Sequence, residues 1–343
     1  MTGIKVITVH LDDDRTVKYT LRGLKDEEIQ AWAQFCSSVF SYKDNAPAAS
    51  YFERHYYNDP RREALLIRVA FTEEGKIVSS CRVFRKIISA GDGETLQAGG
   101  IGEVCTDIDH RKRGLSKYLL QDAIEIMKVR GMQISLLHAA PDFFPVYERG
   151  GGFVCSTSKW SAISISKSDL RSDSRVRIAE FPKDTERLMK LHQKYSENRF
   201  CGMIVRSRKY WNEYLSKELE GSLYVLEWES LIVGWLSVRP RSGRYQVREF
   251  GCDSTKISPC DAISVLLSRA MEGVDLDSFE LQLPTAIFDE IREGKPTFVD
   301  GSTERSEDDL GWMYKALQED SPNEITLTKN DQYPHLIWPA DSF

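Results

Sequence analysis

The pattern of hydrophobic and polar positions is clearest where it predicts a strand, a loop and a helix in succession, beginning at residue 101. Residues 101–106 can form a short buried strand. A polar turn follows at 107–110. Beyond it hydrophobic side chains recur at helical spacing, at Leu115, Tyr118, Leu119, Ala123, Ile126 and Met127. The pattern therefore predicts a strand, a loop over residues 111–116 and a helix in succession.

Similar patterns predict the remaining elements of the first half. Asp26, Glu27 and Glu28 open a helix that reaches about Phe40, because acidic side chains suit the positive end of the helix dipole. The aromatic-rich segment 42–60 is irregular and partly helical. Strands are predicted at 17–24, 65–71, 77–87 and 133–138, and a pair of strands over 153–165.

The second half shows a comparable order of strands and helices. Helices are predicted at 184–198, 208–219 and 257–271. Strands are predicted at 177–181, 222–228, 231–238, 244–251 and 278–283. A polar stretch at 292–309 separates these elements from short apolar segments near the end of the chain.

The length of 343 residues suits two domains and a small third part. We expect one domain at 1–166, a second at 175–290, and an extension at 291–343 that packs back towards the active site. The polar stretch 167–175 is the predicted linker.

Composition narrows the function classes. The net charge of −6 argues against general nucleic-acid binding and mildly suits cationic substrates such as amines. Seven cysteines, odd in number and scattered, suit reduced thiols in the cytoplasm. The sequence has no secretory-signal pattern and no apolar run long enough for a membrane span. It has no CxxC or HExxH motif and its six histidines do not cluster, so no metal site is expected.

The loop at 111–116 has the chemistry of an anion site. Three cations, Arg111, Lys112 and Arg113, precede a helix whose first N–H groups have no partner within the helix. Gly114 lets the backbone approach a ligand closely, so a pyrophosphate is the natural occupant. The ATP pattern GxxxxGK[ST] is absent, and the glycines at 100 and 102 do not continue into a dinucleotide fingerprint. The alternative, a solvated charge run or nuclear-import patch, fits less well with a position between a strand and a helix.

Two landmarks resemble the GNAT superfamily of N-acetyltransferases. Arg111 and Gly114 match the first and fourth positions of the family's acyl-CoA loop, R/Q-x-x-G-x-G/A, and Ser116 replaces the final small residue. Residues 141–153 resemble the second landmark, an aromatic helix that contains Tyr147-Glu148 and ends in Gly-Phe. The resemblance implies an α/β (α+β) GNAT fold, with a mixed, mostly antiparallel sheet flanked by helices. It also implies acetyl-CoA as the acyl donor and no metal.

The resemblance also assigns roles to residues. Tyr147 matches the family tyrosine that protonates the departing thiolate; the alternative is a core aromatic capped by a glycine turn. In the family, the strand before the loop separates from its neighbour, which exposes backbone N–H groups. By position, Val104 or Cys105 would hold the carbonyl oxygen and Thr106 the pantetheine arm. The loop residues that would bind the cofactor are Arg111, Lys112, Arg113, Gly114, Leu115 and Ser116.

The second half resembles tandem acetyltransferases of the mycobacterial enhanced-intracellular-survival type. The similarity lies in residues 199–206 and the following Tyr210-Trp211. It implies a degenerate GNAT-like domain, without its own cofactor loop, that supports the acceptor pocket. Only about 50 residues follow that domain, and this short tail is similar to that of fungal lysine acetyltransferases.

Three carboxylates are candidates for the general base. In the bacterial relatives the last residue is a phenylalanine whose terminal carboxylate takes this role, and Phe343 matches it in type. The alternative is an apolar end that only packs. Glu103 is the second candidate, with a surface carboxylate at a strand edge as its alternative, and Asp107 is the third. Cys105 could suggest a covalent acyl-enzyme, but cysteines in strands are usually inert core residues.

Two classes of function follow. The first is an acetyl-CoA-dependent N-acetyltransferase that acts on a primary amine, free lysine or a similar small molecule, by direct attack in a ternary complex. Within it a protein or peptide lysine acceptor is the alternative. The second class is a non-catalytic CoA-binding scaffold. The loop and Tyr147 together favour the enzyme, with a small-molecule partner, no nucleic acid and no membrane; the sequence leaves the oligomeric state open.

Overall fold

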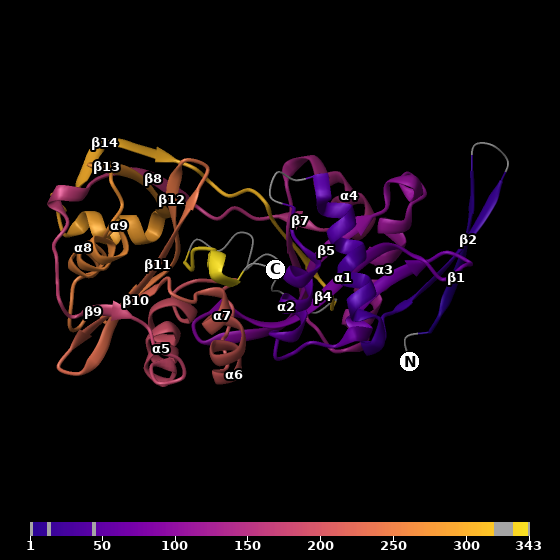
Figure 1. The fold of residues 1–343 in the computed structure, drawn as a ribbon, viewed down its shortest axis with the longest axis horizontal. Coiled ribbons are helices and arrows are strands. Elements are labelled where there is room, and N and C mark those ends of the chain that lie inside the picture. The colour runs from indigo at the N-terminus through magenta and orange to yellow at the C-terminus, as the bar shows by residue number, and fades with distance from the viewer. Residues whose placement is uncertain (1–2, 12–14, 43–45, 319–331, 342–343) are drawn as a thin grey trace.

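Two β-sheets lie side by side along the longest axis of the molecule (Figure 1). The computed structural model describes residues 3–11, 15–42, 46–318 and 332–341. Within these residues the first sheet has eight strands, in the order β1-β2-β3-β4-β5-β6-β15-β7. The second has seven, in the order β14-β8-β13-β12-β11-β10-β9. Helices flank both sheets, and most strand pairs are antiparallel, which confirms the expected α+β class.

The first sheet is built mainly from the first half of the chain. Its strands are β1 Lys5–His10, β2 Thr16–Gly23, β3 Ile67–Phe71, β4 Ile77–Gly91, β5 Glu94–Thr106, β6 Ile134–His138, β7 Val154–Cys155 and β15 Trp312–Ala316. Its helices are α1 Ile29–Val39, α2 Ala49–Tyr57, α3 Leu115–Val129 and α4 Phe144–Gly151. One hydrophobic cluster packs α1 and α2 against the sheet, and a separate cluster packs α3 against it.

The second sheet has its own large core. Its strands are β8 Trp160–Ser166, β9 Val176–Ile178, β10 Leu223–Trp228, β11 Leu231–Arg241, β12 Arg244–Cys252, β13 Ser278–Pro284 and β14 Val299–Ser306. Its helices are α5 Thr185–His192, α6 Arg208–Tyr210, α7 Ser216–Glu218, α8 Pro259–Ala270 and α9 Thr285–Glu293. A π-helical turn, Gln193–Glu197, continues α5, and another, Trp211–Leu215, joins α6 to α7.

Two segments differ from the sequence expectation in their partners. The strand pair expected over 153–165 is divided, because β7 joins the first sheet while β8 pairs with β13 and β14 in the second. From the C-terminal extension, β15 inserts between β6 and β7 of the first sheet. The physical reason is that alternation along a strand specifies which face is buried but not which strand lies beside it. Because the chain crosses between the sheets, the domain limits stay a prediction.

A short segment of the second half joins the sheets to the tail. Residues 201–205 run beside β4, where Ile204 bridges Ile88 and the Val205 N–H donates to the Ile87 oxygen at 2.8 Å. On the other side Cys201 bridges His335 of the tail. A hydrophobic cluster that includes side chains from the first sheet, from this segment and from the tail buries the contact. The segment therefore connects three parts of the chain that are distant in sequence.

Arg206 anchors the tail at this contact. Its guanidinium donates to the Glu249 carboxylate at 2.9 and 2.5 Å and to the Asp341 carboxylate at 2.7–3.2 Å. All three side chains are fully buried. Burial of charges without a partner is costly, so each member of this triad depends on the others. The turn Pro339–Asp341 consequently lies between the two sheets, where Figure 1 shows it in yellow.

The helices and the cysteines can be compared with the expectations from the sequence. None of the helices in the described residues is long and apolar enough to cross a membrane. All seven cysteines are free thiols, and six of them are buried. The cytoplasmic location stays a prediction.

We expect Asp341→Ala to destabilise the protein strongly. Removing one carboxylate leaves Arg206 buried with a single partner, and breaking a buried ion pair costs about 3–5 kcal/mol. Urea denaturation would measure the change in the free energy of unfolding. Glu186→Gln is the control, because Glu186 is exposed and exposed pairs contribute less than about 1 kcal/mol. Equal effects of the two substitutions would contradict a structural role for the triad.

Candidate active site

The first sheet opens at the carboxyl end of β5. The parallel ladder between β5 and β6 ends where Ile101 pairs with Leu137. Beyond this point β5 pairs only with β4, through Cys105 opposite Ser80 and Thr106 opposite Ser79. The structure therefore places Val104 together with Cys105 and Thr106 at a separated strand end, as predicted. Backbone groups on the β6 side of this segment are left without a ladder partner.

A β-bulge interrupts β5 at this opening. Cys105 pairs with Ser80 and Gly102 with Arg82, so Glu103 and Val104 together face one residue of β4. Glu103 has a φ of +50°, which is uncommon for a residue with a side chain. Bulges re-aim side chains and occur often beside active sites. Only 9% of the Glu103 side chain is exposed, so the surface-carboxylate alternative is wrong.

Charged neighbours surround Glu103. The Arg82 guanidinium lies 3.3 Å from the Glu103 carboxylate and 3.7 Å from that of Asp59, and it stacks 3.9 Å from the centre of the Phe84 ring. Burial raises the pKa of Glu103 above its ordinary value, although Arg82 acts to lower it. A carboxylate with a raised pKa is a stronger base than an exposed glutamate, which suits proton abstraction.

Asp107, the third base candidate, has a different environment. Its side chain accepts from the Asp109 N–H at 3.0 Å and lies 3.4 Å from the Lys76 amine. Burial acts to raise the pKa of Asp107, but these two partners outweigh it and the pKa is lowered. Asp107 is therefore a weaker base than Glu103 and serves to order the turn.

The basic loop leads directly into α3. Lys112 and Gly114 have φ values of +61° and +76°, so the backbone here turns through the left-handed region that glycine tolerates best. No side chain caps the first turn of α3, and its N–H groups face the loop. The Arg111 side chain is exposed, and its Nε donates to the Thr106 carbonyl at 3.1 Å, which ties the loop to β5. This arrangement fits a pyrophosphate.

Two of the predicted loop residues are engaged inside the protein. Arg113 donates to the Tyr19 hydroxyl at 2.5 Å and to the Asp109 carbonyl at 2.6 Å, so it orders the loop. Leu115 is buried in the core beneath α3. Leu115 can therefore contribute only its backbone to a ligand, whereas Lys112 and Gly114 are exposed and Ser116 is partly exposed.

Tyr147 lies on α4, on the other side of the sheet from Glu103. It packs edge-on against Phe153, with ring centres 6.3 Å apart, and against the cluster beneath α3. Arg82, the partner of Glu103, instead contacts the aromatic rings of α1 and α2. Burial, with a smaller effect from the Cys81 thiol, raises the pKa of Tyr147, so the hydroxyl holds its proton at neutral pH. The two candidates therefore flank the open strand end from opposite faces.

Helix α2 forms part of the wall on the Glu103 side. Tyr51 packs against His55, with ring centres 4.1 Å apart and the rings tilted by 36°. Burial and the charges of Glu103 and Glu218 raise the pKa of Tyr51 to about 12. Burial and the Arg82 charge lower the pKa of His55 to about 4, so His55 is neutral under ordinary conditions. Glu218 belongs to α7, which places the second half of the chain beside the predicted acceptor wall.

A cavity of about 590 Å³ extends between the two sheets from the end of β6. His138, the last residue of β6, lines it, and His138 Nε2 lies 2.9 Å from a carboxylate oxygen of Asp309. The cavity is also lined by Trp160, Arg239, Arg241, Ser242, Arg244, Gln246, Gln282, Glu307, Asp308, Trp312, Ile337, Trp338 and Pro339. The sequence pattern contained no signal for this set, because its members are brought together only by the packing of the sheets.

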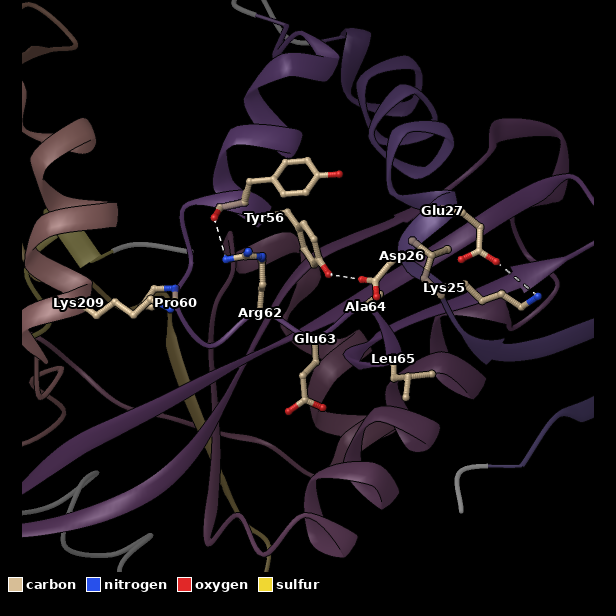
Figure 2. A pocket seen from close by; sticks show the side chains of 12 residues that line it. Lys25, Asp26, Glu27, Tyr56, Pro60, Arg62, Glu63, Ala64, Leu65 and Lys209 are labelled. Carbon is tan, nitrogen blue, oxygen red and sulfur yellow. Dashed lines mark hydrogen bonds and ion pairs between the residues drawn. The ribbon is translucent and has the colours of Figure 1, made fainter.

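A larger cavity, of about 830 Å³, lies elsewhere, where α1 begins and α2 ends (Figure 2). Figure 2 shows Tyr56, whose hydroxyl donates to Asp26 at 3.1 Å, and Lys209, which reaches in from the second half of the chain. It is lined by Leu24, Lys25, Asp26, Glu27, Tyr56, Tyr57, Pro60, Arg62, Glu63, Ala64, Leu65 and Lys209. None of the predicted site residues is among them, so volume alone does not identify the site.

Two further predictions concern the C-terminal residue and a metal site. Phe343 lies outside the described residues, the last of which is Asp341. In the described part of the chain, no three His, Cys, Asp or Glu side chains are grouped to hold a metal ion.

Comparison with known families identifies one domain of the chain. Residues 20–153 match the acetyltransferase (GNAT) domain. This segment contains β5, its bulge, the basic loop and Tyr147. Residues 20–153 therefore form an acetyltransferase domain of the GNAT type, a type that uses an acyl-CoA donor and an amine acceptor.

Similar solved structures extend over both sheets, whereas no curated protein matches the sequence. A GCN5-related N-acetyltransferase from Anabaena variabilis has a TM-score of 0.63 and 15% identity, covering 88% of this chain and 73% of its own. Eis1 from Mycobacterium abscessus has a TM-score of 0.58 and 14% identity, covering 87% and 74%. Saccharomyces cerevisiae N-myristoyltransferase with bound myristoyl-CoA has a TM-score of 0.56 and 12% identity, covering 93% and 89%. At these identities the likeness shows the fold alone.

We expect Arg111→Ala to weaken acetyl-CoA binding by roughly 1–3 kcal/mol, the range for hydrogen bonds to charged groups. The loss should be smaller for a pantetheine analogue that lacks the pyrophosphate. Isothermal calorimetry would measure both affinities. Arg171→Ala, which removes an exposed cation from the second half of the chain, is the control and should change neither. Unchanged affinity in Arg111→Ala would reject this phosphate site.

Proposed function

We propose that the protein transfers an acetyl group from acetyl-CoA to the primary amine of a small molecule, with free lysine as the first candidate. The amine attacks directly in a ternary complex. The observation that carries this proposal is the placement of Glu103 and Tyr147 on opposite faces of the open strand end, one a base with a raised pKa and the other a protonated acid.

Each step of the transfer has a residue to support it. Acetyl-CoA, when bound, supplies an activated acyl group. The N-terminus of α3 with Arg111 and Lys112 holds its pyrophosphate. A backbone N–H of Val104 or Cys105 holds the carbonyl oxygen as negative charge develops there.

Proton transfers on the two faces complete the chemistry. Glu103 removes a proton from the acceptor ammonium, directly or through water, because only the neutral amine is nucleophilic. Tyr147 donates its proton to the departing sulfur. Arg82 holds the Glu103 carboxylate in place. The terminal carboxylate of Phe343 is the alternative base.

The inter-sheet cavity supports a small acceptor. Its volume of about 590 Å³ falls within the range of roughly 300–1,000 Å³ that is typical of small-molecule sites. Residues from both sheets and from the tail line it, which limits access for a folded protein. A protein or peptide lysine is the alternative acceptor, and a panel of amino acids, polyamines and peptides in a thiol-release assay would separate the two.

We expect Tyr147→Phe to lower the turnover number by roughly 10²-fold or more, the usual contribution of a positioned acid. The substitution keeps the ring that packs on Phe153 and removes only the hydroxyl, so folding and acetyl-CoA affinity should be retained. Steady-state kinetics and calorimetry would test both points. Turnover within threefold of the wild-type value would identify Tyr147 as a core aromatic.

A second kinetic test separates the two candidate bases. If Glu103 is the base, kcat/KM rises with pH as Glu103 loses its proton, with an apparent pKa above the ordinary value of 4.5. Glu103→Gln should remove this acidic limb and lower turnover by roughly 10²-fold or more. A C-terminal extension past Phe343 should then leave turnover intact. If the extended protein is inactive while Glu103→Gln keeps its pH profile, the terminal carboxylate is the base.

A further inference from the structure

Two arginines in the inter-sheet cavity are held by one neutral acceptor. Arg239 donates to Oε1 of Gln246 at 3.2 and 2.9 Å, and Arg241 donates to the same oxygen at 3.0 Å. Gln246 is only 4% exposed, and its amide nitrogen donates to Gln282 at 3.0 Å. The amide is therefore fixed with its oxygen towards both guanidinium groups, which are drawn together despite their like charges.

In the described part of the chain, neither guanidinium has an ion-pair partner. Over the described residues, no carboxylate oxygen lies within ion-pair distance of Arg239 or Arg241. The adjacent arginines differ, because Arg244 pairs with Glu280 and Glu307, and Arg248 pairs with Glu218. Burial and the charges of Arg248 and Arg241 lower the pKa of Arg239. Arg239 and Arg241 therefore present to the cavity two guanidinium groups that no described carboxylate holds in an ion pair, although Glu307, Asp308 and Asp309 also line this cavity.

Arg239 of the cavity and the Glu103 carboxylate both affect the pKa of Tyr51. Besides Glu103 and Glu218, the charge of Arg239 affects the ionisation of Tyr51, in the opposite direction. His138, which lines the same cavity as Arg239, follows the residue of β6 that pairs with Ile101, two positions before Glu103. Arg239 therefore lies in a cavity that the last residue of β6 also lines, and it is close enough to Tyr51 to affect the ionisation of that side chain, as Glu103 is.

We propose that Arg239 and Arg241 bind the carboxylate of the acceptor, so that the substrate is an amino acid whose second, side-chain amine reaches Glu103. Planar guanidinium groups donate pairs of parallel hydrogen bonds that match a carboxylate. Gln246 is a positioning residue that keeps both groups aimed into the cavity. This inference rests on the proposed function, because it assigns the far end of the same acceptor.

The test compares amino acids with the amines that lack only their carboxylate. Lysine and cadaverine form one pair, and ornithine and putrescine form another. For the wild type, KM should be lower for the amino acid of at least one pair. Arg239→Gln should raise KM for that amino acid by about 10- to 100-fold, the range for losing a charge-assisted hydrogen bond. KM for the matched amine should change by less than about threefold, and Arg239→Lys should restore part of the loss.

The controls separate a lost carboxylate site from a lost charge or a lost fold. Arg292→Gln removes an exposed arginine of α9 and should leave every KM unchanged. Equal KM increases for lysine and cadaverine in Arg239→Gln would overturn the carboxylate site while leaving the proposed function intact. Equal wild-type KM values for the amino acid and its matched amine in both pairs would also overturn the carboxylate site.

If no amine is acetylated although acetyl-CoA binds, the proposed function fails. The carboxylate site is then tested by calorimetry, which measures the affinities of lysine and of cadaverine for the CoA-bound protein. Tighter binding of lysine that Arg239→Gln abolishes would support the site, and equal binding of the two compounds would overturn it.

Discussion

The buried contact of Arg206 with Glu249 and Asp341 is the constraint on which the arrangement of the two sheets depends. A guanidinium without exposure to water is stable only while both carboxylates face it. Glu249 comes from β12 and Asp341 from the tail, so the contact closes only when the second sheet and the tail are both in place. The adjacent tail residues Ile337 to Pro339 then form part of the cavity wall.

A series of buried charges continues from this contact towards Glu103. Lys86, on the same strand as Arg82, is buried between the aromatic rings of Phe84 and Tyr210. Burial lowers the pKa of Lys86, while the carboxylates of Asp59 and Asp341 act to raise it. Asp59 also faces Arg82, which holds Glu103. Because charges interact strongly where water is excluded, the packing between the sheets influences how strong a base Glu103 is.

Two irregular pieces of backbone determine the geometry of the candidate active site. The bulge at Glu103 turns a carboxylate from a strand edge into a buried position, and the left-handed turn at Gly114 brings a cationic loop to the start of α3. Both lie at the end of β5, where the ladder with β6 stops. In the proposed function, the same strand therefore supplies backbone donors, the candidate base and the approach to the phosphate site, and the candidate acid comes from α4.

The sequence by itself determined the features that depend on neighbouring residues. The strand at 101–106, the loop at 111–116 and the helix behind it follow from local periodicity, charge and glycine, and Tyr147 from its short aromatic motif. Only the tertiary structure decided which segments meet. It inserted β15 between β6 and β7, placed Arg82 against Glu103, and set Arg239 and Arg241 around Gln246 in a cavity that begins near His138. The physical reason is that periodicity records which face of an element is buried, whereas ladder partners and buried charge pairs depend on contacts between residues distant in sequence.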